Sequence, residues 1–321
     1  MKAAVLTSPA RIAARPLEIL DIPIPSPAPG QVLLRVRACG VCRTDLHIVE
    51  GELKPLRDRV IPGHQIVAEV GGHRYGVTWM AGIDGTCEYC LRGEENLCDS
   101  AAFTGYTVDG GYAEYAVARE DFAIPLPAGL SDLEIAPLLC AGVIGFRSLR
   151  VAGVQRGERV GLFGFGASAH LALPVLRAWG CHVSVSTRGA THRKLAESLG
   201  ADWVGSEHDH PPGRLDRAIT FAPSGDVVVA ALASLRKGGV VAINAIHLDR
   251  IPEFDYDSLL WGERQIRSVA NVTRADARDF LQLASEIGLR PKITVFRLDQ
   301  ANEALLALKN DGIDGAAVLV P

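Results

Sequence analysis

The chain has 321 residues, of which 48% are hydrophobic and 22% are charged, with a formal net charge of −4 and a pI near 6.1. This length favours two domains, and the slightly acidic balance argues against a surface that binds nucleic acid or an anionic membrane. We find no signal peptide and no segment long enough to span a bilayer, and seven cysteines suit a reducing compartment, so we expect a cytoplasmic protein without nucleic-acid or membrane partners.

The first 130 residues or so are expected to be mostly β structure. Prolines at positions 23, 25, 27 and 29 precede the alternating run QVLLRVRACG, which predicts a loop that enters a strand. Short strands with glycine turns are predicted over VIPGHQIVAEVGG and GGYAEYAVA. The segment SDLEIAPLLCAGVIGFRSLRVAG then has apolar residues at helical spacing, and Pro137 and the Gly142 region are expected to break this helix.

A dense cluster of possible metal ligands lies in the loop GIDGTCEYCLRGEENLC. Cys87, Cys90 and Cys98 lie close together, and Asp84 stands where a fourth cysteine would continue the pattern. Such ligands can complete a tetrahedral shell around zinc, and metal binding would order a loop that has little core of its own. A disulfide is the weaker alternative, because three cysteines leave one unpaired. A closed site of this kind is structural, so the chemistry is expected elsewhere.

From Glu158 onward the pattern changes to alternating strands and helices. The strand RVGLF, the helix LALPVLRAW and the strand CHVSVS are followed by the helix TRGATHRKLAESLG and by LDRAITF, VVAALASLRKGG and VVAINA. This alternation predicts a parallel sheet with right-handed crossovers. After about residue 271 we expect the helix DARDFLQLASEI, the strand KITVF, the helix ANEALLALKN and the strand AAVLV.

The segment Gly164-Phe-Gly166-Ala167-Ser-Ala169 follows a predicted strand and opens a predicted helix, which is the position of a dinucleotide-binding fingerprint. The two glycines allow a tight turn and let backbone N–H groups approach a pyrophosphate at the helix N-terminus. A plain strand-to-helix turn is the alternative, and the strand–helix–strand context favours the cofactor.

The end of the next strand holds Ser186, Thr187 and Arg188, where a carboxylate would bind the ribose 2′-hydroxyl of NAD. Arg188 can accept a 2′-phosphate instead, so the sequence favours NADP. The alternative is that Arg188 is a solvated residue at the start of a helix.

A further set of reactive residues is GVCRTDLH, which contains Cys42, and the tripeptide GHQ, which contains His64. These motifs, together with the cysteine loop, PLLCAG and GFGASA, resemble those of the zinc-dependent medium-chain alcohol dehydrogenases. They follow one another in the same order as in that family, and the resemblance covers nearly the whole chain. The resemblance implies an α/β fold: a GroES-like, mostly β catalytic domain with an inserted Rossmann domain that has a doubly wound parallel sheet. It implies a catalytic domain at residues 1–143 with a structural zinc lobe at about 78–100, a Rossmann domain at 144–270, and a return to the catalytic domain at 271–321.

The resemblance also implies the ligands of a catalytic zinc. Cys42, His64 and Cys140 match the three protein ligands in the family, which leave a fourth position open for water or a substrate oxygen. Taken alone, Cys140 would be interpreted as a small buried apolar residue and His64 as a structural histidine.

Other residues match groups around that zinc. Thr44 and His47 match the relay that carries the alcohol proton to solvent, and Asp45 matches the carboxylate that orients the zinc-bound imidazole. Taken alone, Asp45 could be an exposed loop acid. Arg43 matches a residue that contacts the cofactor pyrophosphate, and Trp79 resembles an aromatic wall of the substrate pocket.

We therefore expect reversible hydride transfer between an alcohol or aldehyde and NAD(P), with two zinc ions per chain and a homodimer or homotetramer. One alternative is a zinc-dependent NADPH aldehyde reductase that works mainly in the reducing direction. Another is a zinc-free quinone or enone reductase of the same superfamily, and the zinc ligand set argues against it. A non-catalytic zinc-stabilised binding protein is the third, and the intact Thr44 and His47 argue against it.

Four features depart from the family pattern. Gln65 stands where many members carry a glutamate able to approach the zinc, and Asp84 replaces a cysteine. The loop of eight residues between Val70 and Trp79 is short, so we expect it to open one edge of the β domain. Near the C-terminus, NDGIDGAAVLV lacks the arginine that many members use on the pyrophosphate. We expect either weaker cofactor affinity or a transfer of that contact to Arg43 and Arg188.

Overall fold

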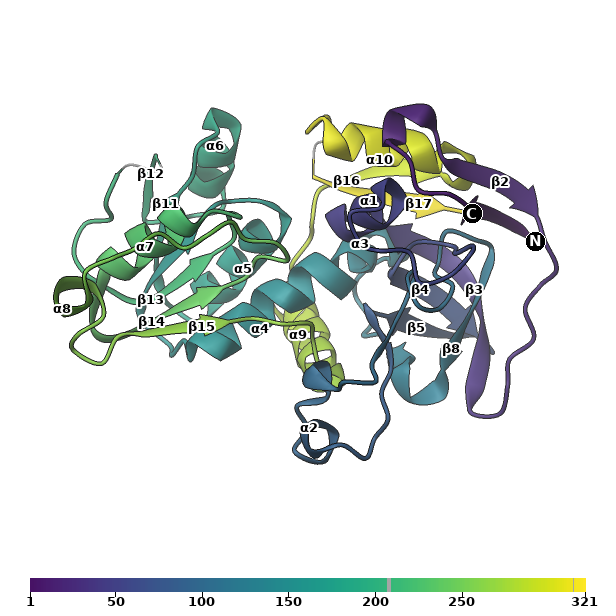
Figure 1. Cartoon of the computed structure of the whole chain (residues 1–321), viewed down its shortest axis with the longest axis horizontal. Coiled ribbons are helices and arrows are strands. Elements are labelled where there is room, and N and C mark those ends of the chain that lie inside the picture. The colour runs from purple at the N-terminus through teal and green to yellow at the C-terminus, as the bar shows by residue number, and fades with distance from the viewer. Residues whose placement is uncertain (207–208, 314) are drawn as a thin grey trace. The chain divides into compact units, whose positions relative to one another are not determined.

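The computed structural model describes residues 1–206, 209–313 and 315–321. The chain folds into two compact units (Figure 1). Unit 1 comprises Met1–Val143 and Asn271–Pro321, and unit 2 comprises Ile144–Ala270. Unit 2 is an insertion, because both ends of the chain belong to unit 1.

Unit 1 is built on a seven-stranded sheet in which β3 is the central element. The strand order is β16-β17-β3-β4-β5-β9, and β8 pairs with the first half of β3. The last strand, β17, pairs with the end of β3, and the N–H of Val41 donates to the carbonyl of Ala317 at 2.9 Å. The strands of this sheet are β3 (Gln31–Gly40), β4 (Gln65–Val70), β5 (His73–Val77), β8 (Tyr115–Arg119), β9 (Ile124–Pro125), β16 (Ile293–Arg297) and β17 (Ala316–Val320).

Two small sheets and several helices complete unit 1. The small sheets pair β1 (Lys2–Leu6) with β2 (Leu17–Asp21), and β6 (Met80–Gly82) with β7 (Ala102–Phe103). The α-helices are α1 (Arg43–Glu50), α2 (Glu88–Leu91), α3 (Asp132–Pro137), α9 (Arg274–Glu286) and α10 (Ala301–Lys309). Single 3₁₀ turns lie at Ile12–Ala14, Glu95–Leu97, Glu120–Phe122 and Leu298–Gln300. A continuous apolar core lies between the sheet, α1 and α10.

The short segment between Val70 and Trp79 does not leave an edge of the sheet open, as we had expected. It forms a tight hairpin in which Gly71 and Gly72 have φ angles of 56° and 81°. Two successive residues with positive φ make a turn whose twist matches that of the flanking strands, which favours glycine at both positions. The strand that follows, β5, is in turn covered by β9.

The helix predicted after Ser131 is not broken at Pro137 and Gly142. Helix α3 continues through a π-helical turn, Leu138–Gly142, into α4 (Val143–Ala152). A π turn shifts the backbone hydrogen bonds by one residue, which accommodates the proline that has no N–H to donate. The run Asp132–Ala152 is long and apolar enough to cross a membrane by length and composition alone, a test that a buried core helix also passes. An 18-residue window within it has a mean hydropathy of 1.5, and 67% of that window is buried inside the protein. The expectation that no segment reaches this length is therefore wrong.

Unit 2 is a six-stranded parallel sheet with the order β12-β11-β10-β13-β14-β15. The order reverses between β10 and β13, and ligands of such sheets bind at the carboxyl ends of the strands at this switch point. The strands are β10 (Arg159–Phe163), β11 (His182–Ser186), β12 (Trp203–Gly205), β13 (Leu215–Thr220), β14 (Leu235–Ile243) and β15 (Gln265–Ser268). The connecting helices are α5 (Ala167–Ala178), α6 (Ala190–Ser198), α7 (Gly225–Ala233) and α8 (Tyr256–Leu259).

The predicted fold class is confirmed: the protein is α/β, with a β-rich unit and a unit that has a doubly wound parallel sheet (Figure 1). Several short elements were missed from the sequence, and α1, α8 and β15 are examples. Helix α1, α8 and β15 have eight residues or fewer, too short for a clear hydrophobic period.

Candidate functional site

Cys42, His64 and Cys140 lie together in unit 1, although they come from three separate parts of the chain. Cys42 lies directly before α1, His64 lies directly before β4, and Cys140 lies in the π-helical turn. One ligand atom from each residue lies within 4.8 Å of the other two, and the two Sγ atoms are 3.9 Å apart.

This arrangement fits a zinc ion. Two thiolates bound to zinc at about 2.3 Å in tetrahedral geometry lie about 3.8 Å apart, close to the observed separation of the sulfur atoms. The side chain of His64 is completely buried, and its Nε2 has no hydrogen-bond partner among the residues that the structure describes. Such an arrangement is costly unless something binds that nitrogen. Three protein ligands leave a fourth position free, as catalytic zinc sites require.

The electrostatics of the site also favour a cation. Burial of the imidazole lowers the pKa of His64, but the Asp45 carboxylate and the Cys42 thiol outweigh burial and raise this pKa to about 10. The contact with Cys140 lowers the pKa of the Cys42 thiol well below its usual value, against the effect of burial. The same contact, followed by burial, raises the pKa of Cys140. The surroundings therefore stabilise a thiolate together with a positive charge at the imidazole.

Asp45 holds the other nitrogen of His64. Its Oδ1 lies 2.9 Å from His64 Nδ1 and accepts a hydrogen bond from the N–H of Gly63 at 3.2 Å. Its Oδ2 accepts a hydrogen bond from the N–H of Cys42 at 2.9 Å, in a capping arrangement at the start of α1. Asp45 is completely buried, so the alternative of an exposed loop acid does not hold.

A fourth contact to Asp45 was missed from the sequence. The hydroxyl of Tyr112 donates to Oδ2 at 3.1 Å, and the ring is completely buried. Tyr112 is 67 residues from Asp45, so no spacing in the sequence could have connected them.

Thr44 and His47 project from the first two turns of α1. Thr44 Oγ1 lies 3.8 Å from the Cys42 sulfur and is nearly buried. His47 is partly exposed, and its Nδ1 contacts a carboxylate oxygen of Glu52, another residue that sequence reasoning missed. Gln65, the first residue of β4, is buried beside Gly40.

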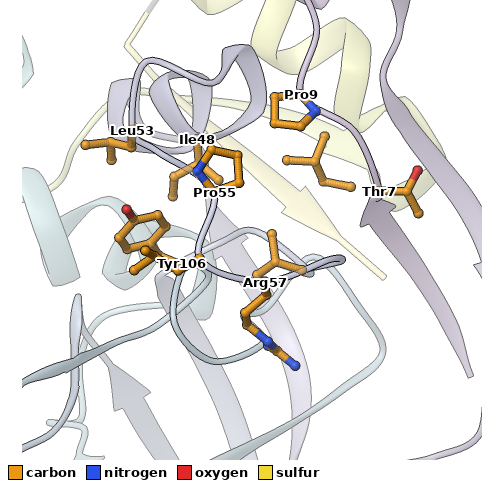
Figure 2. A pocket seen from close by; sticks show the side chains of 10 residues that line it. Thr7, Pro9, Ile48, Leu53, Pro55, Arg57 and Tyr106 are labelled. Carbon is orange, nitrogen blue, oxygen red and sulfur yellow. The ribbon is translucent and has the colours of Figure 1, made fainter.

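Trp79 lies against the metal-type ligands. Its ring meets the His64 imidazole edge-on at 5.2 Å and stacks on Phe103 at 5.0 Å and Tyr106 at 6.0 Å. Tyr106 also lines a small open pocket in unit 1, with an empty volume of about 310 Å³ (Figure 2). Figure 2 shows Pro9 and Pro55 on other sides of this pocket, and none of its lining residues is a metal-type ligand.

Asp84, Cys87, Cys90 and Cys98 form a second group, with ligand atoms within 4.8 Å of one another. The two oxygens of Asp84 differ in their contacts. Oδ1 accepts hydrogen bonds from the N–H groups of Thr86 at 2.8 Å and Cys87 at 2.9 Å, while Oδ2 lies 3.3 Å from the Cys98 sulfur. These backbone bonds hold the pKa of Asp84 far below its usual range. An ionised oxygen that faces three thiols completes a tetrahedral zinc ligand set.

The glycine-rich turn of unit 2 joins β10 to α5. Gly164 has a φ of 87°, and a Cβ there would lie 2.9 Å from the backbone nitrogen of Ala222, so only glycine fits. Gly166 caps α5, and a Cβ there would meet nothing within 4 Å, so the helix N-terminus is open. Ala167 is the first residue of α5, as a fingerprint that presents backbone N–H groups to a phosphate requires.

The residues that were expected to choose the cofactor follow β11. Thr187 is buried and Arg188 is exposed. The guanidinium of Arg193 donates to the carbonyls of both residues, at 3.1 Å and 2.7 Å, which fixes this loop. Arg43, in unit 1, forms an exposed ion pair with Asp311 at 2.9 Å.

Two family models match the chain. The alcohol dehydrogenase GroES-like domain matches residues 28–128, and the zinc-binding dehydrogenase model matches residues 169–286. Among curated relatives, the probable alcohol dehydrogenase AdhA of Mycobacterium tuberculosis is 48% identical over 95% of this chain and 93% of its own length.

Solved structures of the same architecture cover the whole chain. The acetophenone reductase of Geotrichum candidum, in complex with NAD, is 25% identical, with a TM-score of 0.86 over 100% of this chain and 97% of its own. A putative zinc-binding dehydrogenase of Sinorhizobium meliloti, bound to NADP, is also 25% identical, with a TM-score of 0.86 over 100% and 99%. Proteins similar to this chain therefore include structures with either nucleotide.

Proposed function

The chain belongs to the zinc-dependent medium-chain alcohol dehydrogenase family, and from this premise we propose that Cys42, His64 and Cys140 hold the zinc ion at which it oxidises alcohols. It is an oxidoreductase that acts on small alcohols and aldehydes, and zinc and a nicotinamide nucleotide are its cofactors. The observation that carries the site is the buried Nε2 of His64, which has no hydrogen-bond partner and lies beside two thiols.

The residues around the ligands have separate tasks in this proposal. When bound, zinc supplies a Lewis acid and the nicotinamide accepts or returns hydride. Thr44 Oγ1, which lies beside the Cys42 sulfur, takes the proton of the substrate hydroxyl and passes it to the His47 imidazole. Glu52 engages Nδ1 of His47, which leaves Nε2 to release the proton to water.

We propose that the nucleotide pyrophosphate binds at Gly164, Gly166 and Ala167, where α5 begins without a side-chain cap. Thr187 and Arg188 would bind the ribose and its 2′-phosphate, and the lack of a carboxylate there supports NADP over NAD. Arg43 is proposed as a further ligand of the pyrophosphate, and its exposed ion pair with Asp311 is weak enough to exchange.

We also propose a second, structural zinc at Asp84, Cys87, Cys90 and Cys98, which makes two zinc ions per chain. A homodimer or homotetramer is the expected assembly. The cytoplasm is the expected location, because free thiols at all seven cysteines suit a reducing compartment.

The test of the catalytic site is Cys42→Ser. This change removes one thiolate, so we expect turnover to fall below detection, zinc to fall from two to one per chain, and NADPH binding, followed by fluorescence, to persist. Cys181→Ser is the matched control, because Cys181 is a buried thiol of unit 2 outside both ligand groups. Retained activity of Cys42→Ser would remove the zinc assignment.

The substrate and cofactor preferences need a separate measurement. Initial rates with primary, secondary and aromatic alcohols, and with the matching aldehydes, should be compared with NAD and NADP in parallel. A kcat/KM that is higher for aldehydes with NADPH than for alcohols with NADP would favour an enzyme that works mainly as a reductase. Arg188 also favours this direction, because it supports NADP as the nucleotide. Activity only with quinones or enones would contradict the proposal.

A further inference from the structure

Asp45 is a buried carboxylate whose two oxygens are both fully engaged. Oδ1 faces His64 Nδ1 and the N–H of Gly63, and Oδ2 faces the N–H of Cys42 and the hydroxyl of Tyr112. Three of these four partners are a metal-type ligand or its neighbour in sequence. Tyr112 alone comes from a separate segment, between Gly111 and the strand β8.

The hydroxyl of Tyr112 acts as a donor at this position. Its partner is a carboxylate oxygen, and burial, followed by the charge of Asp45, raises the pKa of the phenol well above its usual value. The phenol therefore keeps its proton and gives Asp45 a hydrogen bond to an ionised group, which is stronger than one between neutral groups.

The ring of Tyr112 is fixed by the same loop that carries His64. A Cβ at Gly63 would lie 2.3 Å from Cδ1 of the ring, and Gly63 has a φ of 97°. The ring thus packs directly on the backbone beside the imidazole, in space that exists only because residue 63 is glycine.

We propose that Tyr112 is a positioning residue for the catalytic metal, which it stabilises through Asp45 and the imidazole of His64. This inference rests on the proposed zinc at Cys42, His64 and Cys140. Groups that orient a metal-bound imidazole commonly change metal affinity by 10- to 100-fold when they are removed. Without the phenol, Oδ2 keeps only the N–H of Cys42, so the carboxylate loses one of its four hydrogen-bond contacts and orients the imidazole less firmly.

The first test is Tyr112→Phe, which removes the hydroxyl and keeps the ring that packs on Gly63. Zinc transfer from the intact holoprotein to a metallochromic chelator is followed by absorbance, and each zinc site should give one kinetic phase. The Cys42→Ser protein retains only the site at Asp84, Cys87, Cys90 and Cys98, so its single phase identifies the release of that zinc. We expect the catalytic-site phase to become about 10-fold faster and the second phase to be unchanged. Tyr106→Phe is the control, because it removes a phenol that bonds the Lys54 carbonyl at 2.7 Å.

The second test asks whether the effect passes through Asp45. In an Asp45→Asn background, Tyr112→Phe should have little further effect on zinc release, because both changes remove the same support. The inference would be overturned if Tyr112→Phe left the rate of zinc release from the catalytic site unchanged, or if it accelerated release from both zinc sites equally. It would also be overturned if Tyr112→Phe accelerated release as much in the Asp45→Asn protein as in the wild type. If the wild-type protein has no phase that depends on Cys42, the proposed metal site itself fails, which is a different result.

Discussion

The two carboxylate oxygens of Asp84 have different contacts. Oδ1 accepts the N–H groups of Thr86 and Cys87 and so closes the turn, whereas Oδ2 faces the sulfur of Cys98. A cysteine in this position would supply a softer and stronger zinc ligand but could not hold the turn in the same way. If Asp84 binds zinc as we propose, aspartate in place of cysteine gives a weaker ligand and a better ordered turn.

Substitutions at Asp84 should separate these two tasks. Asp84→Asn keeps an oxygen for the turn but loses the anionic ligand, so we expect faster zinc release from this site, by about 10-fold, with little change in the loop. Asp84→Ala should release zinc and also lower the melting temperature, and Asp84→Cys should slow zinc release. Metal content and thermal melting check these outcomes.

The control for this series is Asp99→Ala, an exposed acid next to Cys98 that lies outside the ligand group. Equal zinc content and equal melting temperatures for the wild type and Asp84→Ala would show that Asp84 is not a ligand.

Arg188 should set the preference between the two nucleotides. If its guanidinium binds the 2′-phosphate, Arg188→Ala should raise KM for NADP by about 10-fold or more, since a lost charge-assisted hydrogen bond costs at least about 1.4 kcal/mol. KM for NAD should stay the same, because NAD has no phosphate there. Steady-state kinetics with both nucleotides give this ratio.

Lys194→Ala is the matched control, because Lys194 is an exposed cation on the next helix, α6. A parallel loss for NAD and NADP in the Arg188→Ala protein would argue for a general electrostatic effect and against recognition of the 2′-phosphate.

Among the elements, the glycine turn between β10 and α5 is predictable from the sequence, since its strand, its glycines and its helix are contiguous. Helix α1 is not, because its eight residues include few apolar ones and its start depends on a hydrogen bond from Cys42 to Asp45. The π-helical turn at Cys140 is equally hidden, because a proline predicts a break where tertiary contacts retain a helix. The prediction that Cys42, His64 and Cys140 lie together depended on the family resemblance, because the two cysteines are 98 residues apart in the sequence.

Asp216 connects β13 to β10 in unit 2 and should make stability depend on pH. Its carboxylate accepts a hydrogen bond from the N–H of Arg159 at 2.8 Å and forms an ion pair with Arg236. Burial raises the pKa of Asp216, but these two contacts outweigh burial and hold the pKa below 3.8. The folded state thus favours the ionised form of Asp216, which adds to the free energy of unfolding. This stabilisation is complete above pH 3.8 and is lost as the pH falls through the lower pKa of the folded state.

The variant Asp216→Asn measures that contribution. We expect it to be less stable than the wild type by about 1 kcal/mol at neutral pH, and the difference should shrink as the pH falls below 3.8. Urea unfolding of both proteins at each pH gives the difference, and any loss of zinc in acid affects both equally. A difference that stays constant across this range would contradict the role of the ionised carboxylate.

At the scale of the whole molecule, unit 2 is contiguous in sequence and unit 1 is not. Unit 2 has its own buried core and a complete parallel sheet, so we expect a fragment of residues 144–270 to unfold cooperatively and to bind nucleotide. A fragment of residues 1–143 lacks β17 and α10, so we expect it to lack cooperative unfolding. Circular dichroism against urea checks both fragments, and cooperative unfolding of the 1–143 fragment would contradict this division.

The pairing of β17 with β3 has a consequence for protein synthesis. The carbonyl of Ala317, in β17, accepts a hydrogen bond from the N–H of Val41, which immediately precedes Cys42. On the ribosome, the inserted unit emerges complete while the segment that carries Cys42 still lacks its neighbouring strand. The backbone that immediately precedes Cys42 therefore gains its partner strand only after the whole of unit 2 has been synthesised.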